Sequence, residues 1–401
     1  MNLRVLLGDQ VVGRLMLLPG EQILFVFADD YLTDANRPVL GQYYRLANNE
    51  LRQETRPTRT KLPPWFSNLL PEGPLLDYIS REAGIHPSRE FQLLAFLGKD
   101  LPGAVRVVSD EASIPGIETL EANAVTKVQQ LRFSLAGVQL KFSALMNKHG
   151  GLTIPAGGVG GEWIVKLPSS IYPAVPENEA AMLTLASRAG IAVPEHRLVP
   201  VTSIEGLPSL GNFADKNALA VRRFDRLSGG GRVHMEDLAQ VFGIFPHDKY
   251  EKVGNVRLAE LIGQILGPVA AQDFVARLAF IVLTGNGDMH LKNWSLLYPD
   301  GRTPILSPAY DLVSTVPYIP NEKLALNIAG EKDFSAITRE RFKRLAEKAA
   351  LPERETLATM ERVVDAVQSG WPEIRREANL PSHITESIDK HLQELPLAQS
   401  R

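Results

Sequence analysis

The 401-residue sequence contains no cysteine, no long apolar run and almost no net charge. Without cysteine, disulfide bonds and thiolate metal sites are excluded, and a reducing cytoplasm is the expected location. No segment approaches the roughly 18 consecutive apolar residues of a membrane span, and Arg4 and Asp9 interrupt the apolar start that a signal peptide would need. The formal charge of −3 gives no electrostatic reason to expect a nucleic-acid or membrane partner.

The remaining composition and the order of patterns predict an α+β protein with several subdomains. Residues 1–60 are rich in strand patterns and helical periodicity follows, so residues 1–108 are expected to form a β-rich amino-terminal module. Strand, glycine-rich turn, strand and helix then succeed one another up to Gly190, and we assign residues 109–224 to a small lobe of strands and a helix. Residues 225–401, including a helix expected over MEDLAQVFG, are predicted to form an all-helical large lobe.

The segment GNGDMHLKNWSLL, residues 285–297, carries the strongest chemical signal. Asp288 and Asn293 lie five positions apart, and Asp311 follows eighteen residues later in SPAYDLVST. Phosphoryl transfer needs one carboxylate to receive the proton of the acceptor hydroxyl, and an amide and a second carboxylate to hold Mg²⁺ on ATP. Alone, each residue would fit a turn or a helix cap equally well. Together they favour a kinase, with Asp288 as the base and with Asn293 and Asp311 as metal ligands.

An upstream lysine completes this set. Lys166 lies in the strand pattern EWIVKLP, where a buried ammonium requires an anionic partner. The phosphate groups of ATP and a carboxylate of the following helix would provide that anion, with Glu179 as the first candidate and Glu177 as the second. The alternative is an edge-strand lysine that faces solvent. Near Asp288, His290 fits a structural histidine, and Lys292 fits either a phosphate contact or a solvated lysine. No zinc cluster and no Ser-His-Asp arrangement is recognisable.

The sequence resembles the HipA family of bacterial serine/threonine kinases over nearly its whole length. The resemblance rests on stretches that occur in the order typical of the family: NLLPEGPLLDYISREAGI, FLGKDLPGAVRV, SLAGVQLKF, WIVKLP, PENEAAMLTLASRAGI, VRRFDR, HMEDLAQ, GNGDMHLKNWSLLY and SPAYDLVST. It implies a two-lobed protein-kinase-like fold, with the amino-terminal module on the small lobe. It also implies ATP and Mg²⁺ as cofactors.

The resemblance implies roles for individual residues. A phosphate loop, an adenine-binding hinge with Asp225 near the ribose, a catalytic base and ATP–Mg²⁺ contacts are expected from the family pattern. The residues concerned are Ala136, Gly137, Val138, Gln139, Leu140 and Lys141 (loop); Lys166; Arg222, Arg223 and Phe224 (hinge); Asp288 (base); and His290, Leu291, Lys292, Asn293, Tyr310 and Asp311. The hinge departs from the pattern, because Arg222 stands where an acid is common.

Ser134 matches the loop serine that HipA-type kinases autophosphorylate, although a serine that caps a turn is an equal alternative. A phosphate there would add about −1.5 to −2 charges beside ATP and inhibit the enzyme. The resemblance also implies a toxin that is paired with a helix-turn-helix antitoxin of the HipB type, which would make any DNA contact. Its substrate would be a translation component such as an aminoacyl-tRNA synthetase.

Two other functions remain open from the sequence. Small-molecule kinases of the aminoglycoside and choline type carry a loop much like GDMHLKN, although the amino-terminal module and SLAGVQLKF favour the HipA-like alternative. A pseudokinase that acts as a binding subunit is the third hypothesis, and the presence of Lys166, Asp288, Asn293 and Asp311 argues against it.

Overall fold

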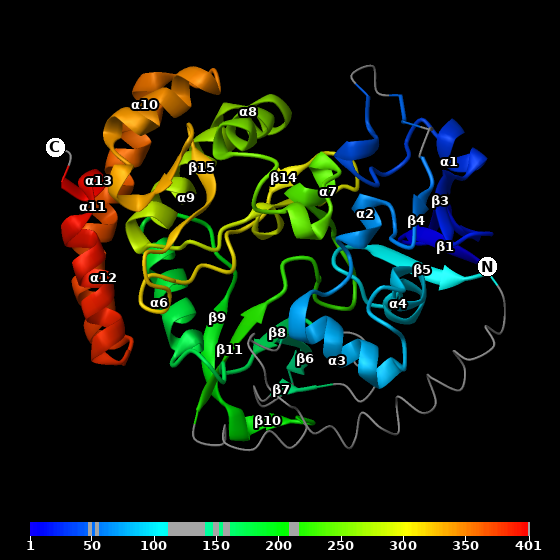
Figure 1. Ribbon diagram of the computed structural model, residues 1–401, viewed down its shortest axis with the longest axis horizontal. Helices are drawn as coiled ribbons and strands as arrows, with labels where there is room; N and C mark the ends of the chain where they lie inside the picture. Colours follow the sequence, from blue (N-terminus) through cyan, green and yellow to red (C-terminus); the bar gives the residue numbers. More distant parts are fainter. Residues whose placement is uncertain are drawn as a thin grey trace.

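In the computed structural model, the amino-terminal module, the small lobe and the large lobe surround a common centre (Figure 1). The structure describes the following residues: 1–46, 50–52, 56–110, 141–146, 152–154, 161–207 and 216–399. None of the helices in these ranges combines the length and apolarity that crossing a membrane would require.

The amino-terminal module is built on an antiparallel sheet in the order β4-β3-β2-β1-β5. Its strands are β1 (Asn2–Leu7), β2 (Gln10–Leu18), β3 (Gln22–Phe27), β4 (Thr58–Arg59) and β5 (Val105–Ser109). Its helices are α1 (Asp29–Thr33), η1 (Gln42–Tyr44), α2 (Pro64–Ser67), α3 (Gly73–Ala83) and α4 (Glu90–Leu97). Alternate residues of β1 are buried, as expected for a sheet with one face on a core. This module has a hydrophobic core of its own.

The small lobe contains a sheet in the order β10-β7-β6-β8-β11-β9, and all pairs except β10 with β7 are antiparallel. Its strands are β6 (Lys141–Met146), β7 (Leu152–Thr153), β8 (Trp163–Lys166), β9 (His196–Pro200), β10 (Ile204–Glu205) and β11 (Asn217–Arg222). A short turn, η2 (Val201–Ser203), joins β9 to β10. In β8, Lys166 lies directly opposite Lys141 of β6 on one side and Leu219 of β11 on the other. This register determines where the lysine side chains can point.

The helix α6 (Val175–Arg188) follows β8 and precedes β9 in the small lobe, and it packs against the large lobe. Pro176 lies in its first turn, where a proline is compatible with helix formation, and Gly190 follows its end with a φ of 80°. Leu183 and Leu185 of α6 belong to the same hydrophobic core as Phe280 in the large lobe. The helix is therefore held between the lobes by a shared core.

The large lobe is mainly helical, but it is not all-helical as the sequence pattern predicted. Its helices are α7 (Leu238–Phe242), η3 (Pro246–Asp248), α8 (Asn255–Leu266), α9 (Pro268–Thr284), η4 (Leu291–Asn293), η5 (Phe334–Ala336), α10 (Arg339–Lys348), α11 (Glu353–Glu377), α12 (Ser382–Glu394) and α13 (Pro396–Gln399). Two small sheets are also present: β12 (His234–Asp237) with β13 (Ser295–Tyr298) and β14 (Ile305–Leu306), and β15 (Lys323–Ile328) with β16 (Glu331–Asp333). The strand β12 takes the first three residues of MEDLAQVFG, the segment that was expected to be one helix.

The amino-terminal module docks on the large lobe through buried polar contacts. Trp65 Nε1 donates to a carboxylate oxygen of Glu236 at 3.0 Å, and the Nε2 atom of His234 hydrogen-bonds to the Leu40 carbonyl at 2.9 Å. Arg226 forms an ion pair with Asp100 at 2.8 Å. Because buried polar groups need such partners, these bonds fix the position of the module.

Candidate active site

The predicted nucleotide lysine lies in a cluster of opposite charges. The ammonium of Lys166 donates hydrogen bonds to Glu179 of α6 and to Asp311 of the loop after β14. Lys166 is only 4% exposed, so it is not a solvent-facing lysine of an edge strand. Burial by itself would lower the pKa of Lys166, but the carboxylates of Asp311 and Glu179 outweigh it and raise the pKa above its ordinary value. Lys166 is therefore a buried cation held by two anions.

A second lysine converges on the same carboxylate. The ammonium of Lys141 lies 3.2 Å from Oδ1 and 3.0 Å from Oδ2 of Asp311. Lys141 and Lys166 are direct neighbours on adjacent strands, an arrangement in which like charges repel unless an anion lies between them. Asp311 now provides that anion. The paired ammonium groups are a suitable cradle for phosphate oxygens.

Asp311 has an unusual backbone conformation and a well-fixed position. Its φ of 53° lies in the left-handed region, which is uncommon for residues other than glycine and is frequent at functional sites. Burial would raise the pKa of its carboxyl, but the neighbouring Lys141 and Lys166 reverse this effect and lower the pKa below its ordinary value. Nearby, the Asn178 side chain bonds to both the carbonyl (2.9 Å) and the N–H (3.1 Å) of Ser314. This amide ties α6, and hence Glu179, to the loop that carries Asp311.

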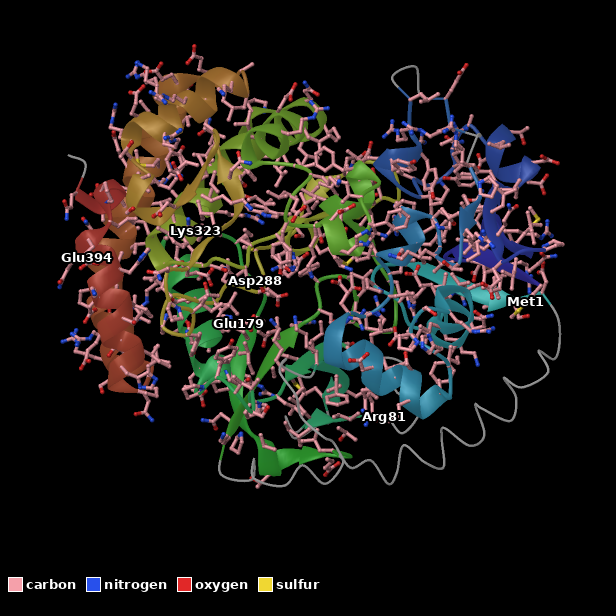
Figure 2. All side chains as sticks on the ribbon, viewed as in Figure 1. Met1, Arg81, Glu179, Asp288, Lys323 and Glu394 are labelled. Carbon is pink, nitrogen blue, oxygen red and sulfur yellow. The ribbon has the colours of Figure 1, made fainter. Side chains whose placement is uncertain are left out.

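The predicted base is presented by a rigid loop. Within residues 285–297, the side chain of Asp288 is exposed, whereas its neighbours are buried or half-buried. The Asn286 side chain accepts from the Asp288 N–H at 3.0 Å and donates to the Asp311 carbonyl at 3.4 Å. Asn293 donates from its amide nitrogen to the Asp288 carbonyl at 3.0 Å. The amide oxygen of Asn293 is consequently the atom that would serve as a metal ligand. Figure 2 labels Asp288 and Glu179 near the middle of the molecule.

A tyrosine that the sequence did not indicate contacts the predicted base. The hydroxyl of Tyr250 donates to Asp288 Oδ1 at 2.7 Å, and its ring meets the ring of His290 edge-on with centroids 5.0 Å apart. His290 is buried, which together with Lys249 lowers its pKa to about 4 despite the nearby carboxylates, and its Nδ1 has no hydrogen-bond partner among the described residues. The His290 side chain is therefore neutral at pH 7, which fits a structural histidine. Its Nδ1 atom, however, makes no hydrogen bond to another described residue that would hold the loop.

Lys292 and Tyr310 hold the loop from outside. The Lys292 ammonium pairs with Glu72 at 2.7 Å and donates to the Asn68 carbonyl at 2.9 Å, both in the amino-terminal module. This differs from the expected contact with a phosphate group. Tyr310 donates to the Lys292 carbonyl at 2.9 Å and bonds to the Ser295 hydroxyl at 2.6 Å. Both residues thus support the loop that carries Asp288, and Leu291, directly before Lys292, is fully buried.

The hinge differs in part from its expected role. The N–H groups of Arg222 and Arg223 are already bound to the carbonyls of Glu195 (2.8 Å) and Glu162 (2.7 Å), so adenine would have to bind nearer Phe224. The ring of Phe224 lies 5.5 Å from that of Tyr310, next to Asp311. Asp225 was expected near the ribose, but it binds Arg223, Arg226 and the Gly103 N–H instead. It is a buried structural carboxylate whose pKa those partners lower against the effect of burial.

Ser134 and the loop residues Ala136 to Leu140 lie outside the described residues. Asn178, Asn286, Tyr250 and Glu72 contact the site but were not predicted from the sequence. Glu72 stands within NLLPEGP, a stretch that the resemblance used, but nothing in the sequence indicated which residues it would contact. Asn178 and Asn286 lie within stretches that the resemblance used, and a buried amide beside a charged site residue is the signal that would have found them.

Comparisons with known proteins identify the family of the chain. A family model described as the HipA-like C-terminal domain matches residues 133–371, and a model described as the HipA N-terminal domain matches residues 3–108. The chain belongs to the HipA family. Its membership places it among kinases, and the expected family resemblance is confirmed.

Several relatives of this HipA-family chain are known. The "Putative kinase Y4dM" of Sinorhizobium fredii is 46% identical over 396 residues, which cover 97% of this chain and 96% of that protein. The serine/threonine-protein kinase toxin HipA of Shewanella oneidensis is 28% identical over 354 residues, covering 79% and 78% of the two chains. A solved complex of a Shewanella oneidensis HipA with HipB and operator DNA contains a chain that matches with a TM-score of 0.75 at 24% identity, covering 98% of this chain and 96% of that one. This likeness confirms the α+β kinase-like fold.

The donor set of this HipA-family site fits ATP and Mg²⁺. Carboxylate and amide oxygens, as in Asp311 and Asn293, are the ligands that Mg²⁺ takes together with phosphate oxygens and water. Among the described residues, no group of three or more His, Cys, Asp or Glu side chains is arranged to hold a metal. A site with one carboxylate and one amide would not form such a group, since the nucleotide itself supplies the other ligands.

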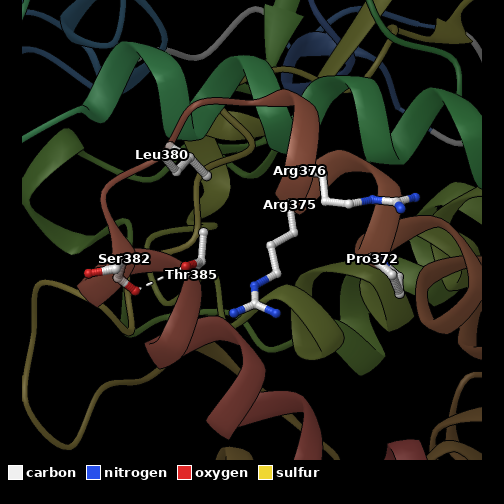
Figure 3. Close-up of a pocket in the computed structure, with 6 residues that line it drawn as sticks. All are labelled: Pro372, Arg375, Arg376, Leu380, Ser382 and Thr385. Atoms are coloured by element: carbon white, nitrogen blue, oxygen red, sulfur yellow. Dashed lines mark hydrogen bonds between the residues drawn. The ribbon is translucent and has the colours of Figure 1, made fainter.

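A pocket of about 520 Å³ lies elsewhere in this HipA-family chain, between the end of α11 and the start of α12 (Figure 3). It is lined by Pro372, Arg375, Arg376, Leu380, Ser382 and Thr385. None of these is a predicted site residue, and Arg375 is already paired with Asp389 at 3.1 Å. This pocket shares no lining residue with the cluster around Asp311.

Proposed function

We propose that this chain is an ATP- and Mg²⁺-dependent protein kinase that phosphorylates serine or threonine, itself included. One observation carries the proposal: Lys166 of β8, Glu179 of α6 and Asp311 of the loop after β14 meet in one largely buried cluster beside the loop that exposes Asp288. A base, a phosphate-binding ammonium and a metal-binding carboxylate in one place are what phosphoryl transfer to a hydroxyl needs.

Each residue has a distinct role in this proposal. When bound, Mg²⁺–ATP supplies the γ-phosphoryl group and the charge neutralisation that its transfer needs. Asp288 orients the acceptor hydroxyl and receives its proton, and its exposure lets a protein side chain reach it. Lys166 and Lys141 bind phosphate oxygens, while Glu179 keeps the Lys166 ammonium in position. Asn293 and Asp311 hold the metal.

The proposal includes a partner, a compartment and a division into parts. A HipB-type helix-turn-helix antitoxin is supported by the solved relative, whose complex contains HipB and operator DNA, and DNA would be reached through that partner alone. The substrate would be a translation-related cytoplasmic protein. We place the boundaries of the amino-terminal module, the small lobe and the large lobe at residues 108 and 224.

The test is phosphate transfer from labelled ATP. Wild-type protein should gain phosphate, mapped by mass spectrometry to Ser134, and Ser134→Ala should remove that label. Asp288→Asn should lose the label while it still binds a fluorescent ATP analogue. Asp9→Asn, an equal charge change at the exposed pair with Arg106, should leave the label unchanged.

Three outcomes would contradict parts of the proposal. Wild-type protein that never gains or transfers phosphate would refute the kinase. Label that survives Asp288→Asn would assign the base to another residue. Phosphate transfer to choline or an aminoglycoside, but to no protein, would establish the small-molecule alternative.

A further inference from the structure

The turn at residues 68–72 of the amino-terminal module binds the catalytic loop directly. The two oxygens of the Glu72 carboxylate contact two different lysines of the large lobe: Oε1 lies 2.7 Å from the ammonium of Lys292, and Oε2 lies 2.7 Å from that of Lys249. The Asn68 carbonyl of the same turn accepts from Lys292 at 2.9 Å. One carboxylate thus connects two segments that are 43 residues apart in the sequence.

Both lysines belong to the immediate surroundings of Asp288. Lys292 stands four residues after Asp288 in the same loop. Lys249 precedes Tyr250, whose hydroxyl donates to Asp288 Oδ1 at 2.7 Å, and the Lys249 carbonyl accepts from the Leu291 N–H at 3.4 Å. Glu72 therefore reaches the candidate base by two routes, through the loop that carries it and through the tyrosine that contacts it.

The geometry of the turn shows that Glu72 is committed to these lysines. It occupies the position before the first turn of α3, where a side chain often caps the helix, yet its carboxylate makes no such cap. Burial would raise the pKa of Glu72, but Lys292 and Lys249 together lower it, so the group is ionised at neutral pH. The turn is itself anchored, because the Asn68 amide donates to the carbonyls of Pro64 (2.9 Å) and Ile244 (2.7 Å).

We propose that Glu72 is a positioning residue for phosphoryl transfer, and that the amino-terminal module holds the catalytic loop in its active geometry through it. The inference rests on the proposed kinase function. It assigns the module a part in the reaction in addition to its part in the fold. Asp288 must lie within hydrogen-bond reach of an acceptor hydroxyl, and small displacements of such a group have large effects on rate.

The expected signature is a loss in turnover without a loss in nucleotide binding. Glu72→Gln keeps the size of the side chain but removes the charge that holds both lysines. We expect kcat for phosphate transfer to fall between about tenfold and a hundredfold. The KM for ATP should stay within about twofold, because Lys141, Lys166 and Asp311 are not in contact with Glu72.

The experiment uses the full-length chain, with Glu72→Gln, Lys292→Gln and the double variant forming a cycle. If the pair acts as a unit, the double variant should be no slower than the slower single variant. Two controls are available. Asp77→Asn removes an exposed carboxylate from the same helix, and Arg232→Gln removes an ion pair (3.3 Å to Asp100) that joins the same module to the large lobe away from the loop. Both controls should keep the wild-type kcat.

A second readout does not depend on activity. Amide hydrogen exchange over residues 286–293 should be faster in Glu72→Gln than in wild type and in both controls. If wild type shows no phosphate transfer, the proposed function fails, and faster exchange would still establish the link between Glu72 and the loop. If wild type is active and Glu72→Gln matches it in both kcat and exchange, the positioning role is refuted. A loss that Arg232→Gln shares to the same extent would also refute it, since any weakening of the module would then suffice.

Discussion

The ammonium of Lys166 and the carboxylate of Asp311, which stand 145 residues apart in the sequence, share a hydrogen bond. Lys166 comes from the central part of the small-lobe sheet, and Asp311 comes from the large lobe. Their contact therefore joins the small-lobe sheet to the large lobe. A lysine directed into solvent would have left the carboxylates of Asp311 and Glu179 without this buried cation.

Lys166 and Lys141 should differ sharply in what they contribute to stability. Lys166→Met would leave the buried Glu179 carboxylate without its cation and should lower the free energy of unfolding by about 3 kcal/mol. Lys141→Met should change it by less than about 0.5 kcal/mol, because the Lys141 side chain is 41% exposed. Urea denaturation measures both. Adding Glu179→Leu to Lys166→Met should restore most of the loss, and a double variant as unstable as the single one would contradict this account.

Tyr250→Phe tests the hydrogen bond to the candidate base. Without the hydroxyl, the Asp288 carboxylate loses the donor at Oδ1 and can rotate, so we expect initial rates of phosphate transfer to fall about tenfold. ATP binding should be unchanged, because Tyr250 is not among the contacts of Lys166 or Asp311. Faster phosphate transfer by the variant would contradict this account. It would show that the Tyr250 hydroxyl competes with the acceptor hydroxyl for Asp288.

Glu236 should make stability depend on pH at the junction of module and large lobe. Burial raises its pKa to about 7, against the lowering effect of its donors Tyr298, Gln42 and Trp65. Because the folded pKa lies above the unfolded value near 4.5, the folded state binds the proton more readily, and this contribution to stability is lost as pH rises from about 4.5 to 7. The full difference corresponds to about 3 kcal/mol.

The measurement compares wild type with Glu236→Gln by denaturation at pH 5, 6, 7 and 8. Stability relative to the variant should fall as pH rises to about 7 and then level off. The comparison is needed because His234 and His290, with pKa values lowered to about 4, give both proteins the opposite slope below pH 6.5. A constant difference between the two proteins would show that Glu236 does not titrate there.

Gly287, directly before Asp288, has no room for a side chain. A Cβ atom there would lie 2.4 Å from Cδ of Glu322, although the φ of Gly287 is not in the left-handed region. Gly287→Ala must therefore displace Glu322 or the catalytic loop, and we expect phosphate transfer to fall about tenfold. Glu322→Ala in the same chain should recover most of the rate. If it does not, the strain is taken up by the loop itself.

Local signals in the sequence predicted many of the helices and strands. Lys166 lies in a strand, as expected. Two helix boundaries carry their usual local signals: Gly84 ends α3 with a φ of 64°, and Pro176 lies in the first turn of α6. The helix expected over MEDLAQVFG was wrong in its first three residues, because residues 234–237 form β12 and pair with β13 instead. Asp237 and Gln240 form the capping box that starts α7 at Leu238, so a local signal for the true boundary was present.

The candidate site was predictable only where a motif carried its chemistry. Asp288, Asn293 and Asp311 follow from the residue types that phosphoryl transfer needs, and the structure brings Asp288 and Asp311 together through Asn286. The partners of Lys292 and Asp225 could not be predicted, because each binds a residue of the amino-terminal module more than 100 positions away. Such contacts depend on how the parts dock, and no local periodicity encodes that docking.

The bonds between Glu236, His234 and the amino-terminal module have a practical consequence for dissecting this protein. Expressing the lobes alone would strip Glu236 of the indole of Trp65 and the N–H of Gln42, and would deprive His234 of its carbonyl partner at Leu40. The surface of the large lobe that the module normally covers would then expose unsatisfied polar groups and apolar side chains to water. A fragment without the module should therefore precipitate. Loss of activity in such a fragment would not show which part of the chain carries the catalytic residues.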